Sequence, residues 1–135
     1  HFLLRIRGGC LQIGLLIHLH VQQRLAVNFS IAVQWHYLNE LEYSRLRSEC
    51  SGLIVTLGER GAKVPHHDLE CPTKAVEVMD VCGCGDTFLA ALTAQYLFTK
   101  DIEKAIIFAN VAAGITVQHR GNYAPSYDEI RNAGY

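Results

Sequence analysis

The sequence predicts an α/β fold, and three stretches of the chain carry that prediction. Residues 52–57 ("GLIVTL") are a continuous apolar run rich in β-branched side chains, which is typical of a strand buried on both faces. Residues 83–85 ("GCG") form a glycine-rich gap. Residues 87–98 ("TFLAALTAQYLF") are apolar nearly all round, which indicates a helix buried on several sides. A strand, a gap and then helices follow one another as in an α/β domain.

The elements before the gap are predicted with unequal clarity. Residues 1–50 form a poorly assigned N-terminal segment, in which residues 37–50 are the best helix candidate. After the strand at 52–57, "GERG" interrupts the chain, and "AKV" at 62–64 is expected to be a short return strand. Residues 66–74 are predicted to be a loop. Residues 75–80 ("AVEVMD") are predicted to be a second strand that enters the gap.

Two helices after the gap are predicted from their caps. Asp101 is the expected N-cap of a helix whose apolar positions between 102 and 117 follow the i, i+3, i+4, i+7 spacing. After a loop at 120–126, Ser126 is expected to cap a last helix. Glu129, three residues later, would complete a capping box with it.

Composition and charge exclude several classes of function. The 135 residues are 50% hydrophobic and 19% charged, as in one globular domain, and the net charge of -1 creates no field that would attract nucleic acid or an anionic membrane. The apolar stretch 11–27 is interrupted by histidine, glutamine and arginine, so no membrane span is expected there. Five cysteines without regular spacing and without a secretory signal predict a reduced, cytoplasmic protein.

The gap at 83–85 predicts an anion site. A strand that ends there and continues into a helix directs unpaired backbone N–H groups, and the positive end of the helix dipole, toward one point. It is not a Walker loop, because no Gly-Lys-Ser/Thr follows, and the dinucleotide motif would need glycine at Phe88. Asp86 beside this site either accepts a hydroxyl proton in phosphoryl transfer or caps the helix, and spacing alone favours neither. Cys84 is expected to be more acidic than an ordinary thiol.

Three motifs in order resemble the ribokinase/PfkB family of carbohydrate kinases. Residues 80–86 ("DVCGCGD") are similar to the family signature D-T/V-x-G-A-G-D, with Cys84 in place of the usual alanine. Residues 54–62 ("IVTLGERGA") are similar to its T-x-G-x-x-G segment, and residues 108–117 ("FANVAAGITV") to its helix beside the adenine. The resemblance implies a ribokinase-like three-layer sandwich, of which residues 51–135 are the C-terminal, nucleotide-binding part.

The resemblance also implies roles for individual residues. Asp86 would be the catalytic base, and the anion hole would consist of Gly83, Cys84 and Gly85. The residues expected along the nucleotide are Thr56, Gly58, Gly61, Asn110 and Ala113. Asp80 falls where some members hold a monovalent cation such as K⁺. Without the resemblance, Asn110 would be interpreted as a hydrogen-bonded amide in the core.

The function implied by the resemblance is phosphoryl transfer from ATP, with Mg²⁺, to a hydroxyl of a sugar or sugar phosphate. Within the family, the chain looks most like kinases of heptose 7-phosphate. The alternative is a non-catalytic nucleotide-binding module or an inactive fragment. The expected partner is a small molecule rather than nucleic acid or a membrane, and homo-oligomerisation stays open.

The metal ligands are the least clear part of the prediction. Family members usually carry Asn-x-x-Glu upstream, but Asn28 is followed by Ile31 at the glutamate position, and Asn39 with Glu42 lies close to Thr56. Histidine and cysteine are the usual ligands of zinc, and the candidates here are His66, His67, Cys71, Cys82 and Cys84. Their spacing in the sequence argues against a zinc site.

Overall fold

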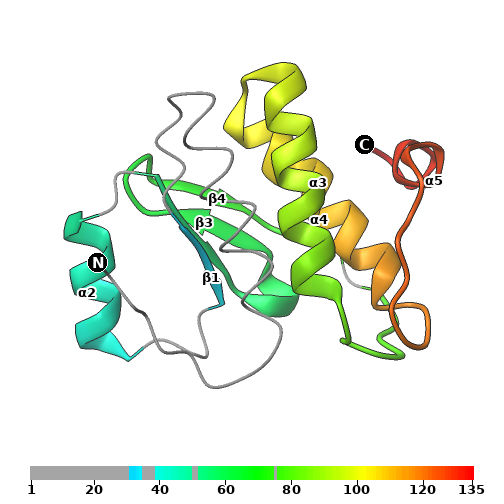
Figure 1. Ribbon diagram of the computed structural model, residues 1–135, viewed down its shortest axis with the longest axis horizontal. Coiled ribbons are helices and arrows are strands. Elements are labelled where there is room, and N and C mark those ends of the chain that lie inside the picture. Colours follow the sequence, from blue (N-terminus) through cyan, green and yellow to red (C-terminus); the bar gives the residue numbers. More distant parts are fainter. Residues whose placement is uncertain (1–30, 35–38, 50–51, 75) are drawn as a thin grey trace, which may run out of the picture.

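The computed structural model describes residues 31–34, 39–49, 52–74 and 76–135, which form a small sheet between helices (Figure 1). The predictions for residues 1–30, including the apolar stretch 11–27 and Asn28, lie outside the described residues. The elements are β1 (Ile31–Gln34), α2 (Glu40–Glu49), β2 (Leu53–Thr56), the 3₁₀ turn η2 (Gly58–Arg60), β3 (Ala62–Val64), β4 (Leu69–Cys71), α3 (Cys84–Thr99), α4 (Ile102–Thr116) and α5 (Tyr127–Asn132).

The sheet has the strand order β1-β2-β3-β4, which is also the order along the chain. β1 and β2 are parallel, with Ala32 opposite Ile54, and α2 lies between them in sequence. Parallel neighbours need such a crossover, whereas the antiparallel pairs β2–β3 and β3–β4 need only short turns. Thr56 at the end of β2 pairs with Ala62 at the start of β3.

β2 is buried on both faces, as its apolar run predicts. Leu53 and Val55 pack with Leu46 of α2, whereas Ile54 packs in a cluster formed with α3 and α4. Successive side chains of a strand point to opposite faces, so the sheet is the middle layer between α2 and the pair α3 and α4. This arrangement, visible in Figure 1, confirms the predicted three-layer α/β fold.

The two predicted helix caps are confirmed. The Asp101 side chain accepts a hydrogen bond from Lys104 N at 3.1 Å at the start of α4. Ser126 and Glu129 form both bonds of the capping box at the start of α5. α5 packs on α4 through Ile130. Within the described ranges, no helix has the length and apolar character needed to cross a membrane.

The segment between β3 and α3 differs from its prediction. The predicted loop 66–74 contains β4, which pairs with β3 after a turn in which Asp68 has a positive φ of 49°. The predicted strand 75–80 does not form: residues 76–80 are in no strand, and Val78 and Met79 are 56% and 57% exposed. Apolar alternation is insufficient for a strand, because a strand also needs a partner to pair with.

Candidate functional site

The glycine-rich gap forms a tight turn that begins α3. Cys84 N donates to Val81 O at 3.4 Å, and Gly83 has φ 76° and ψ −4°, close to the third position of a type II turn, which favours glycine. Gly83 is the N-cap of α3, and no side chain caps this helix. The N-cap residue therefore offers no side-chain acceptor to the backbone N–H groups of the first turn, an arrangement that suits an anion site.

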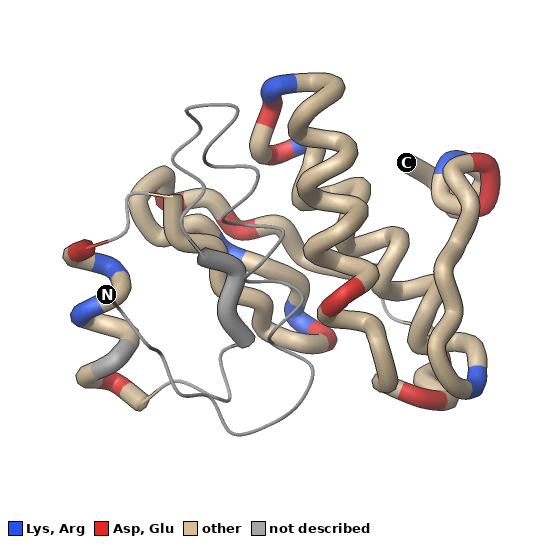
Figure 2. The backbone as a smooth tube through the Cα atoms, in the orientation of Figure 1, with Lys and Arg blue, Asp and Glu red and all other residues tan. Residues whose placement is uncertain are grey.

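Asp86 lies in the first turn of α3 with an exposed side chain. It is not the N-cap, so the interpretation of Asp86 as a helix cap is not supported. Asp86 is also the one charged residue of α3, and Figure 2 shows that the charged positions of α3 and α4 lie near helix ends. A single exposed carboxylate therefore stands beside uncapped N–H groups.

Cys84 does not have the acidity predicted from its position at a helix N-terminus. Burial raises the pKa of the half-buried Cys84 thiol above its usual 9.0, and the charges of Asp86 and Cys82 raise it further. Hydrogen bonds from the backbone N–H groups of Gly85 and Cys84 act in the opposite direction, but they do not reverse it. Desolvation of a thiolate therefore outweighs the favourable effect of the helix end.

Asp80 connects the turn to the loop that follows α4. Its Oδ1 accepts from Cys82 N and its Oδ2 accepts from Gly121 N, both at 2.9 Å. These two hydrogen bonds hold the pKa of Asp80 below its ordinary value. Next to Gly121, Asn122 Oδ1 accepts the Cys82 Sγ–H at 3.4 Å. The sequence interpretation missed the contacts of both loop residues, because no local pattern marks contacts that span 41 and 40 residues.

Two predicted residues from different motifs meet at the carbonyl group of Cys71. Asn110 is 7% exposed, and its Nδ2 donates to Cys71 O at 2.9 Å. Gly61 lies against the same carbonyl group, because a Cβ at position 61 would overlap its oxygen. Asn110 therefore has the hydrogen bond of a core amide, and its role beside adenine stays a prediction. Ala113, one turn later, is partly buried against the main core cluster.

Thr56 and Gly58 lie at the junction of β2 and η2. Thr56 is the last residue of β2, and Gly58 is exposed, with φ 63° and no atom within 4 Å of a Cβ built on it. In the described part of the chain, no hydrogen bond joins η2 to residues 80–86. The contact of Thr56 and Gly58 with a nucleotide stays a prediction.

No metal cluster is present among the residues that the structure describes, which contain no group of three or more His, Cys, Asp or Glu suited to holding an ion. His66 instead bonds through Nε2 to Arg47 O, 2.6 Å away, near the end of α2. Cys71, Cys82 and Cys84 are free thiols. Mg²⁺ commonly binds through one or two carboxylates together with the phosphates of a substrate, and such a site would not require a preformed cluster.

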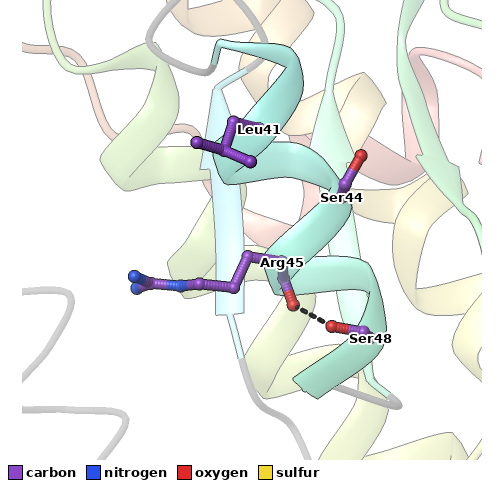
Figure 3. Close-up of a pocket in the computed structure, with 4 residues that line it drawn as sticks. All are labelled: Leu41, Ser44, Arg45 and Ser48. Carbon is purple, nitrogen blue, oxygen red and sulfur yellow. Dashed lines mark hydrogen bonds between the residues drawn. The ribbon is translucent and has the colours of Figure 1, made fainter.

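A hollow of about 430 Å³ lies on the opposite side of the sheet, beside α2. It is lined by Leu41, Ser44, Arg45 and Ser48, and Leu41 and Arg45 extend to the same side of the helix (Figure 3). Ser48 Oγ donates to Arg45 O at 2.8 Å. No predicted site residue lines this hollow, so it is separate from the turn at α3.

Comparison with known proteins assigns a family to most of the described chain. Residues 38–129 match the pfkB family of carbohydrate kinases. The bifunctional protein HldE of Pseudomonas entomophila is 41% identical over 88 residues, which are 63% of this chain and 19% of that protein. The chain thus spans about a fifth of the length of this relative.

Solved structures agree on the fold. A nucleoside kinase of Burkholderia thailandensis in complex with inosine is 31% identical, with a TM-score of 0.61, over 74% of this chain and 37% of that one. The aminoimidazole riboside kinase of Salmonella enterica, complexed with aminoimidazole riboside and an ATP analog, has a TM-score of 0.68 over 76% and 40% of the two chains. It is 24% identical and shows the ribokinase fold alone.

Proposed function

Because the chain belongs to the pfkB family of carbohydrate kinases, we propose that residues 51–135 are the ATP-binding part of an enzyme that phosphorylates a sugar or sugar phosphate. The observation that carries the proposal is the start of α3, where uncapped backbone N–H groups and the exposed Asp86 lie within one helical turn. ATP, when bound, supplies the phosphoryl group. The N–H groups of residues 83–85 bind phosphate oxygens, and Asp86 accepts the proton of the attacking hydroxyl.

The charge of Asp86 supports a catalytic rather than a binding role. A carboxylate beside an anion site repels the phosphates and weakens their binding. It does not compensate by capping α3, because Gly83 occupies the N-cap. Accepting a proton from the acceptor hydroxyl gives the carboxylate a use that accounts for its position.

We propose heptose 7-phosphate as the acceptor, on the basis of the sequence resemblance and of the 41% identity to HldE. Asp80 supports a role for K⁺ only in part. Its two oxygens already accept backbone N–H groups, but each oxygen of an ionised carboxylate retains a further lone pair for a cation. The proposed Mg²⁺ would bind with the phosphates of the nucleotide.

ADP binding and phosphoryl transfer test the proposal together. Calorimetric titration of the chain with ADP and Mg²⁺ should give heat, and nucleotide should raise its melting temperature. No heat and no thermal shift at millimolar ADP would disprove the nucleotide assignment. Transfer of labelled phosphate from ATP to heptose 7-phosphate then tests the reaction itself.

The Asp86→Asn variant separates the base from the binding site. We expect a loss of transfer of about 10²–10⁴-fold, typical of general-base removal, with ADP affinity unchanged or slightly higher because repulsion is removed. Asp128→Asn is the matched control, since Asp128 is an exposed acid in the first turn of α5. Equal transfer rates in the two variants would contradict the role of Asp86.

A second candidate is a nucleotide-binding module without catalysis. The chain spans 19% of HldE and 37% of the nucleoside kinase, so catalysis by the residues present is itself to be tested. A chain that binds ADP but transfers no phosphate to any sugar phosphate would support this module. Detectable transfer that depends on Asp86 would support the kinase.

A further inference from the structure

We propose that Asn122 is a positioning residue for the anion-binding turn, on which the proposed function depends. Its side chain lies directly against Gly83: a Cβ built on that glycine would stand 2.8 Å from Asn122 Oδ1 and 3.6 Å from its Cγ. The same oxygen accepts the Cys82 Sγ–H at 3.4 Å. The amide of Asn122 therefore occupies the space beside the turn and touches two consecutive residues of it.

The backbone that carries Asn122 is held on both sides. Before it, Gly121 N donates to Asp80 Oδ2 at 2.9 Å. After it, Tyr123 O accepts a hydrogen bond from the buried Thr116 Oγ1 at 3.1 Å, and the Tyr123 ring stacks on His119 with 3.7 Å between centroids. Asn122 is thus fixed between two anchored neighbours, although its own side chain is exposed.

The turn needs such a support because it is built on glycine. Glycine has more accessible backbone conformations than any other residue type. As the N-cap of α3, Gly83 also has no side chain that could cap the helix and hold the turn in place. The orientation of the peptide group after Gly83 decides where the Cys84 N–H points. A turn that is already ordered binds phosphate without the entropic cost of ordering it at that moment.

If Asn122 positions the turn, replacing it should lower the affinity for ligands that carry phosphate and leave the affinity for a nucleoside unchanged. In Asn122→Ala the turn loses this contact, in which the thiol is a weak donor, so we expect ADP to bind more weakly by up to about fivefold, the effect of one ordinary hydrogen bond. Adenosine has no phosphate, so its affinity, measured by NMR titration, should not change. The melting temperature should stay close to that of the parent chain, because the side chain is exposed.

The control is Asn132→Ala, the same substitution at an exposed position of α5. This variant should bind ADP and adenosine as the parent does. The inference is wrong if Asn122→Ala binds ADP as tightly as the control. It is equally wrong if ADP and adenosine weaken in the same proportion, because that result indicates a general loss of structure.

A measurement without nucleotide separates this inference from the proposed function. The amide resonances of Gly83, Cys84 and Gly85 should shift in Asn122→Ala and stay in place in Asn132→Ala. If these amides shift but the parent chain binds no ADP, Asn122 positions the turn and the nucleotide assignment fails. If the parent binds ADP but the amides do not respond, the assignment stands and the positioning role fails.

A double-mutant cycle on ADP affinity measures the contact itself. Gly83→Ala introduces a Cβ against Asn122 Oδ1 and also a side chain at a positive φ of 76°. Only the first effect depends on Asn122. We expect the loss of affinity in Gly83→Ala to be smaller in an Asn122→Ala background, and strictly additive losses would contradict a direct contact.

Discussion

Gly61 and Gly58 allow a direct test of why the T-x-G-x-x-G segment contains two glycines. Both have positive φ, 86° and 63°, which disfavours any other residue. Their surroundings differ. A Cβ on Gly58 meets nothing within 4 Å, whereas a Cβ on Gly61 would overlap the carbonyl oxygen of Cys71 and lie 2.9 Å from Thr73 N.

The structure therefore predicts unequal costs for the two alanine variants. Gly58→Ala should lose only the conformational term, about 1–2 kcal/mol of unfolding free energy. Gly61→Ala should lose about 1–3 kcal/mol for a glycine-only backbone region and about 1–3 kcal/mol more for overpacking against backbone. The sum, about 2–6 kcal/mol, is a large part of the 5–15 kcal/mol typical of a whole domain.

Urea unfolding followed by circular dichroism is the assay for both variants. We expect the midpoint of Gly61→Ala to fall well below that of Gly58→Ala, or Gly61→Ala to be unfolded without urea. Equal midpoints would refute the reasoning, because the close approach of Cys71 would then carry no cost. ADP titration of Gly58→Ala then measures the predicted nucleotide contact of this exposed glycine, with little change of fold.

Two further predictions concern polar contacts. Asn110→Ala leaves Cys71 O without its buried partner and should lower the unfolding free energy by about 1–3 kcal/mol; a urea midpoint equal to the parent's would contradict the core role of the amide. Hydrogen bonds from Tyr123 and Ser126 lower the pKa of Glu129 from 4.5 to about 2, so its stabilising effect is present above pH 4.5 and is lost as the pH falls toward 2. The melting temperatures of Glu129→Gln and the parent should therefore converge in acid, and a constant difference from pH 6 to pH 2 would disprove this linkage.

The elements that were predicted correctly from the sequence are those that depend on residues close together in the sequence. The caps at Asp101 and Ser126 join residues three positions apart, so their signals are complete within a short stretch. β4 and the segment 75–80 were predicted wrongly for the opposite reason. Leu69–Cys71 is a strand because β3 lies beside it, and residues 76–80 are in no strand although their pattern is more strand-like.

The site divides in the same way. The residues of the turn and Asp86 are adjacent in sequence, so the motif contains their geometry. Asn122 contacts Cys82, 40 residues away, and Cys71 contacts Asn110, 39 residues away. These contacts form only in the folded chain, so the sequence alone did not predict them. The acidity of Cys84 was mispredicted because the helix end is visible in the sequence, whereas the burial of the thiol is not.

The burial of β2 on both faces has a consequence for how the chain opens. Leu53 and Val55 support the α2 layer and Ile54 supports the layer of α3 and α4, so neither layer can separate without exposing this strand. The two layers should consequently unfold as one cooperative unit. In hydrogen exchange, the amides of this strand should be among the slowest, and they should exchange only in molecules that have unfolded globally.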